Sequence, residues 1–398
     1  MEKSLIVNRD GRVDITKILL ALIRSELCGM QIDEKTCRML SHEDLRELYK
    51  VAKAHDVAHL VSDALYRCGI LGNDEVSDKF KNKHFLAVYR TTSMKYALDS
   101  ICSVLEANEI PYILLKGSII RSLYPDDWMR TSCDIDILIH ESDLESAVKA
   151  LVNTLGYKTD GERHYHDVSL YSDTGVHLEL HFSLKENMDN IDDLLSMVWS
   201  YSTRQGDSGF KFNQDPEYFV FHHIAHMSYH FIHGGCGIKP FMDLHIINAK
   251  MKYDDSTVRK YCKQCGLEHF YDNVKHVSNV WFGNAFHTIN SQRIEAYILK
   301  GGVYGTLENR IAVAQSKRGG RLKYAISRIF PSYELLKISY PILEKHKYLY
   351  PFMQIRRWFR IVFFGGLGRG VKEMKINQSV DNNQSADMND FLHDIGLG

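Results

Sequence analysis

The spacing of hydrophobic residues divides the chain into parts of different character. Near the N-terminus, apolar side chains recur every three or four residues, which predicts amphipathic helices. These helices cover 15–27, 45–65 and 85–105. Helical spacing returns after Asp215-Pro216, where Asp is a favourable N-cap and Pro suits the first turn, and it continues to about residue 364. From residue 372 the chain is rich in Asn, Gln, Ser and Asp, and we expect a mobile tail.

Between the helical parts, the pattern predicts a small sheet. Short apolar runs bounded by turn-forming residues are typical of strands. The predicted strands cover 111–115, 134–139, a hairpin across 164–171, and 176–184. An amphipathic helix at 144–155, with Gly156 as its C-cap, connects two of them. We therefore expect an α+β fold in which a mixed sheet flanked by helices is embedded between N- and C-terminal helical regions. The expected parts are 1–99, 100–205, 206–370 and 371–398.

Alternation along two predicted strands places acidic side chains on one exposed face. Asp134 and Asp136 lie on the face opposite to that of the neighbouring isoleucines. Glu179 shares one face with His177 and His181, opposite to the apolar residues that alternate with them. If the two strands are neighbours, the three carboxylates lie together. Like charges at close range raise one another's pKa unless a cation neutralises them. Mg²⁺ (or Mn²⁺) is the expected cation, because it prefers oxygen ligands and shares phosphate oxygens.

A phosphate-binding turn is the second candidate feature. Gly117-Ser118 follows a buried strand and opens a helix, so its backbone N–H groups can face phosphate oxygens. Lys116 and Arg130 are candidate counter-charges for the phosphates. A lone Asp-x-Asp occurs by chance about once in a chain of this length. The ordered set of glycine turn, Asp-x-Asp strand and glutamate strand is far more specific.

These motifs resemble a known family. The segments 115–118, 130–139 and 178–181 are similar to those of the uncharacterised nucleotidyltransferase family of the DNA polymerase β superfamily. The similarity extends to the N-terminal helices, to the His-rich segment 222–233 with the following 239–244, and to about residue 365. Two departures stand out. Fifteen residues separate Ser118 from Asp134, more than is usual in the superfamily, and the third acid is Glu rather than Asp.

The resemblance implies a polymerase-β-like palm and assigns roles to the motif residues. Asp134, Asp136 and Glu179 would bind the metals, with Glu179 also the candidate base for the acceptor hydroxyl. Gly117 and Ser118 would hold the triphosphate. The implied reaction moves a nucleoside monophosphate from an NTP to an unidentified acceptor hydroxyl and releases pyrophosphate. Because family members are often associated with surface-polysaccharide biosynthesis, a saccharide-linked acceptor is suggested.

Two other functions stay open. One is a catalytically inactive binding or scaffold protein that keeps the fold. The other is a glycosyltransferase, whose Asp-x-Asp also holds a metal–nucleotide, although the long nucleotide-sugar domain expected ahead of that motif is missing.

A stripe of histidines lies on one face of the helix after Pro216. Its members are His222, His226, His230 and His233. We expect hydrogen-bonded histidines in a helical interface, with zinc or a phosphohydrolase-like site as alternatives. A further interpretation is that His226, Lys239 and Asp243 line the acceptor side of the cleft.

Cys262 and Cys265 form a lone C-x-x-C, which we expect to be structural because zinc needs four ligands.

The segment 345–360 mixes basic and aromatic residues. We expect its aromatic side chains to pack inward, and peripheral contact with an anionic membrane is the alternative.

Composition limits which compartments and which classes of partner are expected for the protein. The 398 residues carry 49 Lys and Arg against 50 Asp and Glu, so a nucleic-acid partner is not expected. Eight cysteines are too sparse for a disulfide framework. The sequence shows neither a secretory signal nor an apolar stretch long enough to cross a bilayer, which favours a cytoplasmic protein.

Overall fold

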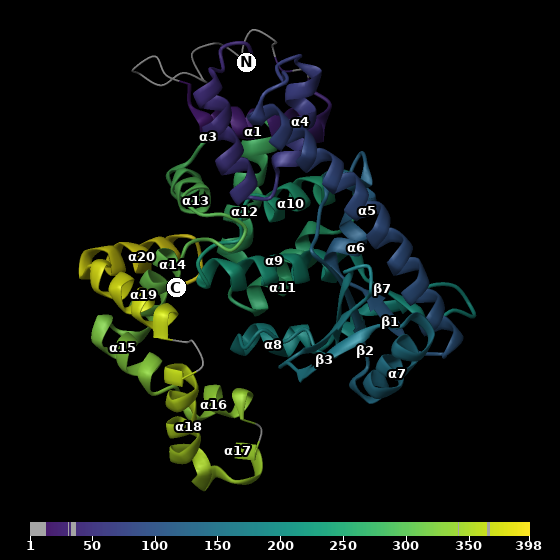
Figure 1. Ribbon diagram of the computed structural model, residues 1–398, viewed down its shortest axis with the longest axis vertical. Helices are drawn as coiled ribbons and strands as arrows, with labels where there is room; N and C mark the ends of the chain where they lie inside the picture. Colours follow the sequence, from purple (N-terminus) through teal and green to yellow (C-terminus); the bar gives the residue numbers. More distant parts are fainter. Residues whose placement is uncertain (1–12, 31, 33–36, 341, 364–366) are drawn as a thin grey trace. The chain divides into compact units, whose positions relative to one another are not determined.

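The computed structural model describes residues 13–30, 32, 37–340, 342–363 and 367–398 (Figure 1). The first twelve residues, on which the expectation of no secretory signal depends, lie outside the described residues. The chain forms two compact units. The larger contains Met1–Tyr229 and Cys236–Val303, and the smaller contains His230–Gly235 and Tyr304–Gly398.

Several helices precede the sheet, and three of them begin at a side-chain N-cap. They are α1 (Ile15–Cys28), α3 (His42–Ala54), α4 (Ala58–Arg67) and α5 (Glu75–Ala107). Asp14, Ser41 and Asp74 accept hydrogen bonds from the first turns of α1, α3 and α5. The single helix predicted for 45–65 is instead broken between α3 and α4. At the break Asp56 has φ of 53°, a left-handed conformation that Asp tolerates better than most residues.

A seven-stranded mixed sheet forms the centre of the larger unit. Its strands are β1 (Tyr112–Leu114), β2 (Asp134–Ile139), β3 (Lys158–Arg163), β4 (Asp167–Tyr171), β5 (His177–His181), β6 (Ser202–Arg204) and β7 (Lys211–Gln214). The spatial order is β3-β4-β5-β2-β1-β7-β6. The pairs β2–β5 and β1–β7 are parallel, and the others are antiparallel. This mixed sheet with flanking helices confirms the predicted α+β class. β6 and β7 were not predicted, because their short, largely polar sequences carry no strand-like apolar run.

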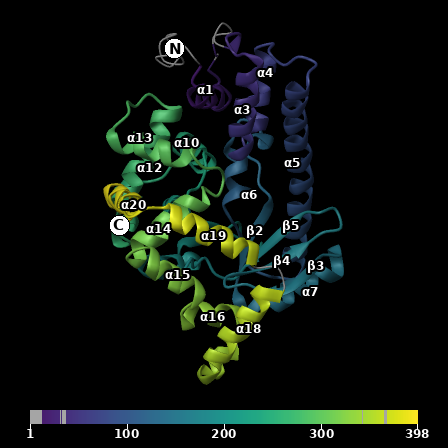
Figure 2. The same ribbon diagram turned by 60° about the vertical axis from the view of Figure 1, so that its left-hand side comes forward.

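One face of the sheet is covered by α5 and α7 (Leu144–Leu155), which lie together in both views (Figures 1 and 2). The buried side chains of β2 and β5 join those of the two helices in one core. Each fully buried Ile or Leu contributes about 1.5–3 kcal/mol relative to an exposed one. A shift of β2 by one residue would place its aspartates in this core, so the hydrophobic pattern fixes which face carries the acids.

Further helices of the larger unit lie between the strands and after the last strand. They are α6 (Lys116–Ile120) between β1 and β2, then α8 (Asp189–Leu195), α9 (Pro216–Ile232), α10 (Lys239–Lys250), α11 (Asp255–Gln264), α12 (Glu268–Phe282) and α13 (Ile289–Leu299). The last turn of α9 belongs to the smaller unit. Among the described residues, no helix has the length and apolar character needed to cross a membrane.

The smaller unit is helical to its end. Its helices are α14 (Leu307–Arg318), α15 (Arg321–Ile329), α16 (Tyr333–Ser339), α17 (Ile342–Lys345), α18 (Tyr350–Phe363), α19 (Leu367–Ser379) and α20 (Asn382–Asp394). The structure thus differs from the mobile tail expected at 371–398. Val380, Leu392 and Ile395 are buried, and Gln315 donates to the backbone and side chain of Asn377. A few buried apolar residues therefore order a segment whose average composition is polar.

Candidate active site

The register of two parallel strands brings the predicted carboxylates together. β2 and β5 pair side by side, so that Asp134 lies opposite His177 and Asp136 lies opposite Glu179. The ligand atoms of Asp134, His177 and Glu179 lie within 4.8 Å of one another, and so do those of Asp136, Glu179 and His181. Glu179 belongs to both groups. The condition on which the carboxylate prediction depended, that the two strands are neighbours, is therefore met.

Burial and neighbouring charges shift the pKa values of two acids in the cluster, in opposite directions. Burial raises the pKa of Asp134, and the negative charges of Asp136 and Glu179 raise it further. Burial acts on Asp136 in the same direction, but the hydrogen bond and positive charge of His181 bring its pKa below the usual value. His181 Nε2 lies 3.2 Å from Asp136 Oδ1 and 3.5 Å from Glu179 Oε2.

His181 itself is charged at neutral pH. Burial would lower its pKa, but its hydrogen bonds to Asp136 and Glu179 raise the pKa to about 9. One imidazolium thus balances part of the negative charge of three carboxylates. The remaining negative charge, and a donor set of carboxylate oxygens with the His177 imidazole, fit one or two divalent cations. The carboxylates suit Mg²⁺ or Mn²⁺, whereas imidazole ligands are more typical of transition metals.

The glycine turn lies next to the acids. The Leu115 N–H donates to the Asp136 carbonyl at 3.1 Å, which fixes the start of α6 beside β2. Lys116 is partly buried; burial lowers its pKa, while the nearby carboxylates of Glu186, Asp136 and Asp134 act in the opposite direction. A Cβ built on Gly117 would lie 3.7 Å from Ser132 Cβ and 3.9 Å from Arg130 Nη1. Lys116 and Gly117 therefore adjoin both the acid cluster and the segment that precedes β2.

Arg130 lies beside Gly117, but its guanidinium is bound by protein groups. Nε and Nη2 donate to the Asp243 carboxylate at 2.9 Å each, and Nη1 donates to the Thr131 carbonyl at 2.9 Å. The Tyr124 hydroxyl donates to the same carboxylate at 2.7 Å. The Asp243 side chain is 1% exposed and that of Arg130 14%. The pair is thus a buried anchor for the segment before β2, rather than a free guanidinium.

Lys239 and His226 are also bound within the protein. Lys239 Nζ lies 2.7 Å from Asp56 Oδ2 and donates to the Thr131 carbonyl at 3.2 Å. His226 Nδ1 lies 3.1 Å from Glu186 Oε1. Lys239, at the start of α10, therefore connects the segment that Arg130 anchors to the break between α3 and α4, where Asp56 lies.

The long connection between Ser118 and Asp134 supplies its own anchor. It contains two short 3-10 helices, Arg121–Leu123 and Asp127–Met129. Arg121 donates to the Arg130 carbonyl at 3.1 Å and to Ser132 Oγ at 2.6 Å, and Ser132 Oγ donates to the Asp134 carbonyl at 3.0 Å. The additional residues hold the entry to β2 in place.

Sequence reasoning assigned no role to several of these residues. His177 and His181 were recognisable, since alternation along β5 places them on the face of Glu179. Asp56, Tyr124 and Arg121 had no such signal, because their partners are fixed by tertiary packing.

His222 belongs to the predicted histidine stripe, and His223 is its neighbour in the chain. His222 and His223 are buried, and His223 Nε2 lies 3.0 Å from the Pro240 carbonyl. His222 Nδ1 has no hydrogen-bond partner among the described residues. Burial lowers the pKa of its ring, and the positive charge of Lys116 lowers it further.

Cys262 and Cys265 are buried free thiols. Burial raises the pKa of both, which is consistent with the structural role expected for them.

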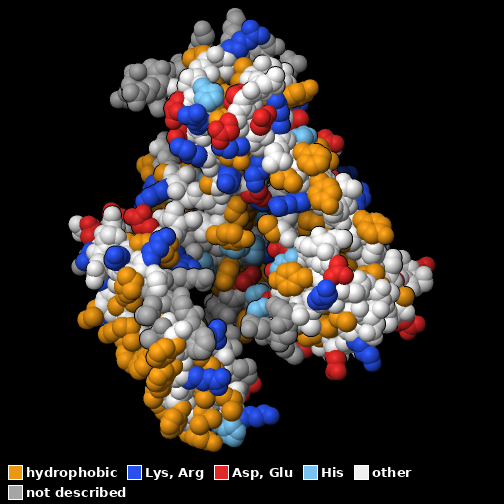
Figure 3. Space-filling model, viewed as in Figure 1, with side chains coloured by type: hydrophobic (Ala, Val, Ile, Leu, Met, Phe, Trp, Pro, Cys, Tyr) orange, Lys and Arg blue, Asp and Glu red, His pale blue; other side chains and the backbone are white. Residues whose placement is uncertain are grey.

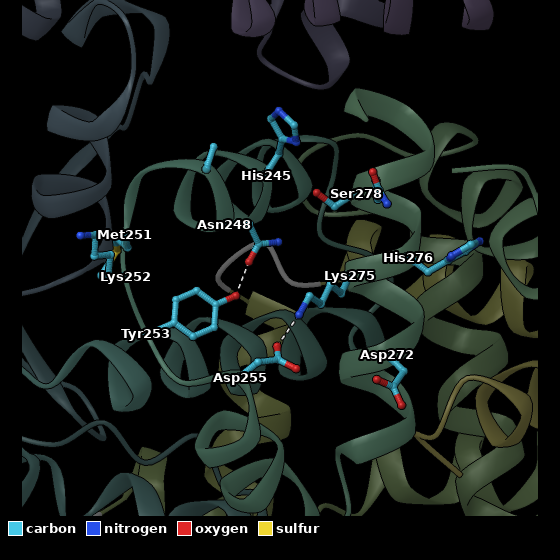
Figure 4. A pocket seen from close by; sticks show the side chains of 12 residues that line it. His245, Asn248, Met251, Lys252, Tyr253, Asp255, Asp272, Lys275, His276 and Ser278 are labelled. Atoms are coloured by element: carbon cyan, nitrogen blue, oxygen red, sulfur yellow. Dashed lines mark hydrogen bonds and ion pairs between the residues drawn. The ribbon is translucent and has the colours of Figure 1, made fainter. Parts of the chain in front are cut away.

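A separate cavity of about 810 Å³ is lined by α10, α11 and α12 (Figure 4). Two pairs of its polar side chains are joined by hydrogen bonds: Lys275 donates to Asp255, and the Tyr253 hydroxyl donates to Asn248. It contains none of the predicted site residues.

Comparisons with known proteins place the chain in a family. No curated protein and no solved structure matches it significantly. A family model described as an uncharacterised nucleotidyltransferase matches residues 41–283, more than half of the chain. The matched region contains the glycine turn, the three carboxylates and both anchors. The chain therefore belongs to this uncharacterised nucleotidyltransferase family, which confirms the resemblance drawn from its motifs.

Proposed function

We propose that the protein is a metal-dependent nucleotidyltransferase that moves a nucleoside monophosphate from an NTP to an acceptor hydroxyl. The observation that carries this proposal is the meeting of Asp134, Asp136 and Glu179 on adjacent parallel strands, beside the turn at Lys116–Gly117, in a chain of this family. In the proposed reaction, the acceptor oxygen bonds to the α-phosphorus while the bond to pyrophosphate breaks.

Each residue in the site has a proposed task. Asp134, Asp136 and Glu179, with His177 as a nitrogen donor, would hold divalent cations. His181 would join them as a ligand only after losing its proton, since an imidazolium has no free lone pair. Such cations, when bound, lower the pKa of the acceptor hydroxyl and stabilise charge on the leaving pyrophosphate.

Protein groups carry out the remaining tasks. Glu179 Oε accepts the proton of the acceptor hydroxyl, Lys116 Nζ faces the phosphate charge, and Gly117 and Ser118 orient the triphosphate. Arg130, Asp243 and Lys239 act as positioning residues for the segment that leads to Asp134.

The acceptor can be found by labelling. The protein is incubated in cell extract with each α-labelled NTP and Mg²⁺ or Mn²⁺, and the labelled product is identified; a saccharide-linked hydroxyl is the expected class. Label transfer that is lost in the Asp134→Asn/Asp136→Asn double variant supports the proposal. Transfer that persists in that variant rules it out.

A catalytically inactive binding protein is the second candidate. It is favoured by one observation: His181 contacts two of the three carboxylates and can balance their charge without a metal. Calorimetry separates the candidates, because an enzyme must bind an NTP in a metal-dependent way. Absence of such binding with both Mg²⁺ and Mn²⁺ would favour the inactive protein.

Addition of metal is expected to stabilise the fold. At a Mn²⁺ concentration of about 100 times Kd, linkage contributes about 2.7 kcal/mol to the free energy of unfolding. We expect a Tm increase of several degrees relative to EDTA, larger with Mn²⁺ than with Mg²⁺ because of the imidazole ligand. The Asp134→Asn/Asp136→Asn variant, measured by the same calorimetric scan, should show almost no increase. An equal increase in that variant would locate the metal elsewhere.

Gly117→Ala is expected to weaken NTP binding without unfolding the protein. The added methyl meets its nearest neighbours at ordinary contact distance, and Ala in a helical turn is more favourable than Gly by about 0.5–1 kcal/mol. Unfolding by urea should therefore show equal or slightly higher stability. In the proposed phosphate turn, the same methyl would stand where the triphosphate approaches, and calorimetric Kd for the NTP should rise at least about tenfold. An unchanged Kd would remove Gly117 from the binding site.

A further inference from the structure

In the smaller unit, helix α18 presents polar side chains to the protein and hydrophobic side chains to the outside. Gln354 is buried and donates to the Pro331 carbonyl at 2.8 Å, and Arg357 and Trp358 donate to the Ile329 carbonyl. Phe352 and Phe359, in contrast, are 62% and 60% exposed. The outward stripe of α18 consists of Phe352, Ile355, Phe359 and Phe363, and the exposed Tyr348 lies in the turn just before the helix. A surface helix of a globular protein normally has the opposite arrangement.

Helix α15 repeats this inverted arrangement. Tyr324 is its buried side chain and donates to Glu373, and the half-exposed Arg328 donates to the same carboxylate at 2.7 Å. Its outward side chains are Leu322, Ile326 and Ile329, and Leu322 is 74% exposed. Hydrophobic side chains consequently gather over the part of the smaller unit that contains α15, α16 and α18 (Figure 3). We call the outward side chains of α15 and α18 the apolar face.

The apolar face lies in the most basic part of the chain. Residues 321–375 contain twelve Lys and Arg but three Asp and Glu, a net charge of +9, whereas the whole chain has a charge of −1. Lys323, Lys347, Arg356 and Arg360 are exposed on the helices and turns that bear the apolar face. The basic side chains therefore border hydrophobic groups that water solvates poorly.

We propose that the apolar face docks on the surface of an anionic lipid bilayer. Interfacial helices combine an apolar stripe with flanking Lys and Arg in this way, and they lie in the headgroup region without crossing the membrane. A second copy of the chain does not fit, because two surfaces of the same positive charge repel each other. Single-stranded nucleic acid uses aromatic platforms, whereas this face is also aliphatic, with Leu322, Ile326 and Ile355. The expectation that the aromatics of 345–360 pack inward therefore does not hold for Phe352 and Phe359.

Flotation of the full chain with vesicles tests the proposal, independently of any transferase activity. Vesicles of phosphatidylcholine with about 30% phosphatidylglycerol should bind the protein at least about tenfold more tightly than phosphatidylcholine alone. Raising NaCl from about 0.1 M to about 0.5 M should weaken this binding. The Phe352→Ser/Ile355→Ser/Phe359→Ser variant lacks three side chains of the apolar face and should no longer bind the vesicles. The Arg356→Gln/Arg360→Gln variant should weaken binding to the anionic vesicles only.

A matched control comes from the larger unit. Phe85, Tyr89 and Tyr96 on α5 are also exposed, and their triple replacement by Ser should leave vesicle binding unchanged. Circular dichroism establishes that each variant is folded. Equal binding to neutral and anionic vesicles, loss of binding in the α5 control, or tighter binding to an RNA oligonucleotide than to vesicles would overturn the proposal. The proposal would also fail if the natural protein were a dimer, and the α18 variant became a monomer but bound vesicles as before.

Discussion

Asp134→Asn is expected to abolish nucleotidyl transfer and, in EDTA, to make the protein more stable. Burial and the charges of Asp136 and Glu179 hold the pKa of Asp134 above its value in the unfolded chain. A raised carboxyl pKa stabilises the fold at low pH, and that contribution is lost as the pH rises through the folded pKa. At pH 7 the ionised Asp134 therefore opposes folding, and an uncharged amide should raise the free energy of unfolding by about 1–2 kcal/mol. Loss of a proposed metal ligand should reduce kcat/KM by about a thousandfold or more.

Asp136→Asn is the matched variant, with the opposite effect on stability. The hydrogen bond from His181 brings the pKa of Asp136 below its ordinary value, so its ionised form supports folding above that value. An amide weakens that contact to a buried imidazolium, and we expect a loss of about 1–3 kcal/mol. Urea unfolding in EDTA measures both variants, and steady-state label transfer measures their activity. Stability changes of the same sign would contradict the charge distribution described here, whereas retained activity in either variant would contradict the proposed function.

The faces of β2 and β5 could be predicted because a strand has a period of two. Once Ile135 and Leu178 are assigned to the core, Asp136 and Glu179 must point the other way. The family resemblance supplied what the period could not, namely the prediction that the two strands contribute to one nucleotide site. The parallel register itself arises from packing of the whole sheet, which no local spacing encodes.

Other parts of the site could not be predicted, for a related reason. Arg130 and Asp243 are 113 residues apart, and Lys239 and Asp56 are 183 apart. A basic residue beside a phosphate turn has the same local sequence whether it binds phosphate or a distant carboxylate. The C-terminal helices were missed because average composition hides the few apolar residues, such as Val380, that are buried.

Asp243→Ala is expected to cause the largest loss of stability of any single substitution discussed here. It leaves the Arg130 guanidinium and the Tyr124 hydroxyl without their common acceptor in a site where the carboxylate is 1% exposed. Removal of one member of a buried ion pair costs about 3–5 kcal/mol, because an uncompensated charge stays behind. Tyr124→Phe removes one neutral donor and should cost only about 1 kcal/mol. Urea unfolding at pH 7 measures both.

The double variant Arg130→Met/Asp243→Leu separates the energy of the ion pair from its role in positioning. Because apolar residues of similar volume often replace a buried pair without loss, the double variant should be more stable than Asp243→Ala and close to the natural protein. Its activity should nevertheless be low, since Arg130 also holds the Thr131 carbonyl in the segment that leads to Asp134. Activity that recovers together with stability would show that the pair serves folding alone.

The pH dependence provides an independent check on the same pair. Burial opposes ionisation of Asp243, but the charge and hydrogen bonds of Arg130 bring its pKa below the ordinary value. A lowered carboxyl pKa contributes stability above the unfolded pKa, and this contribution disappears as the pH falls through the folded pKa. The natural protein should therefore lose part of its stability below about pH 4, and the double variant should lack that part of the loss. Because both proteins keep the acid cluster on β2 and β5, the difference between their profiles isolates the Arg130–Asp243 pair.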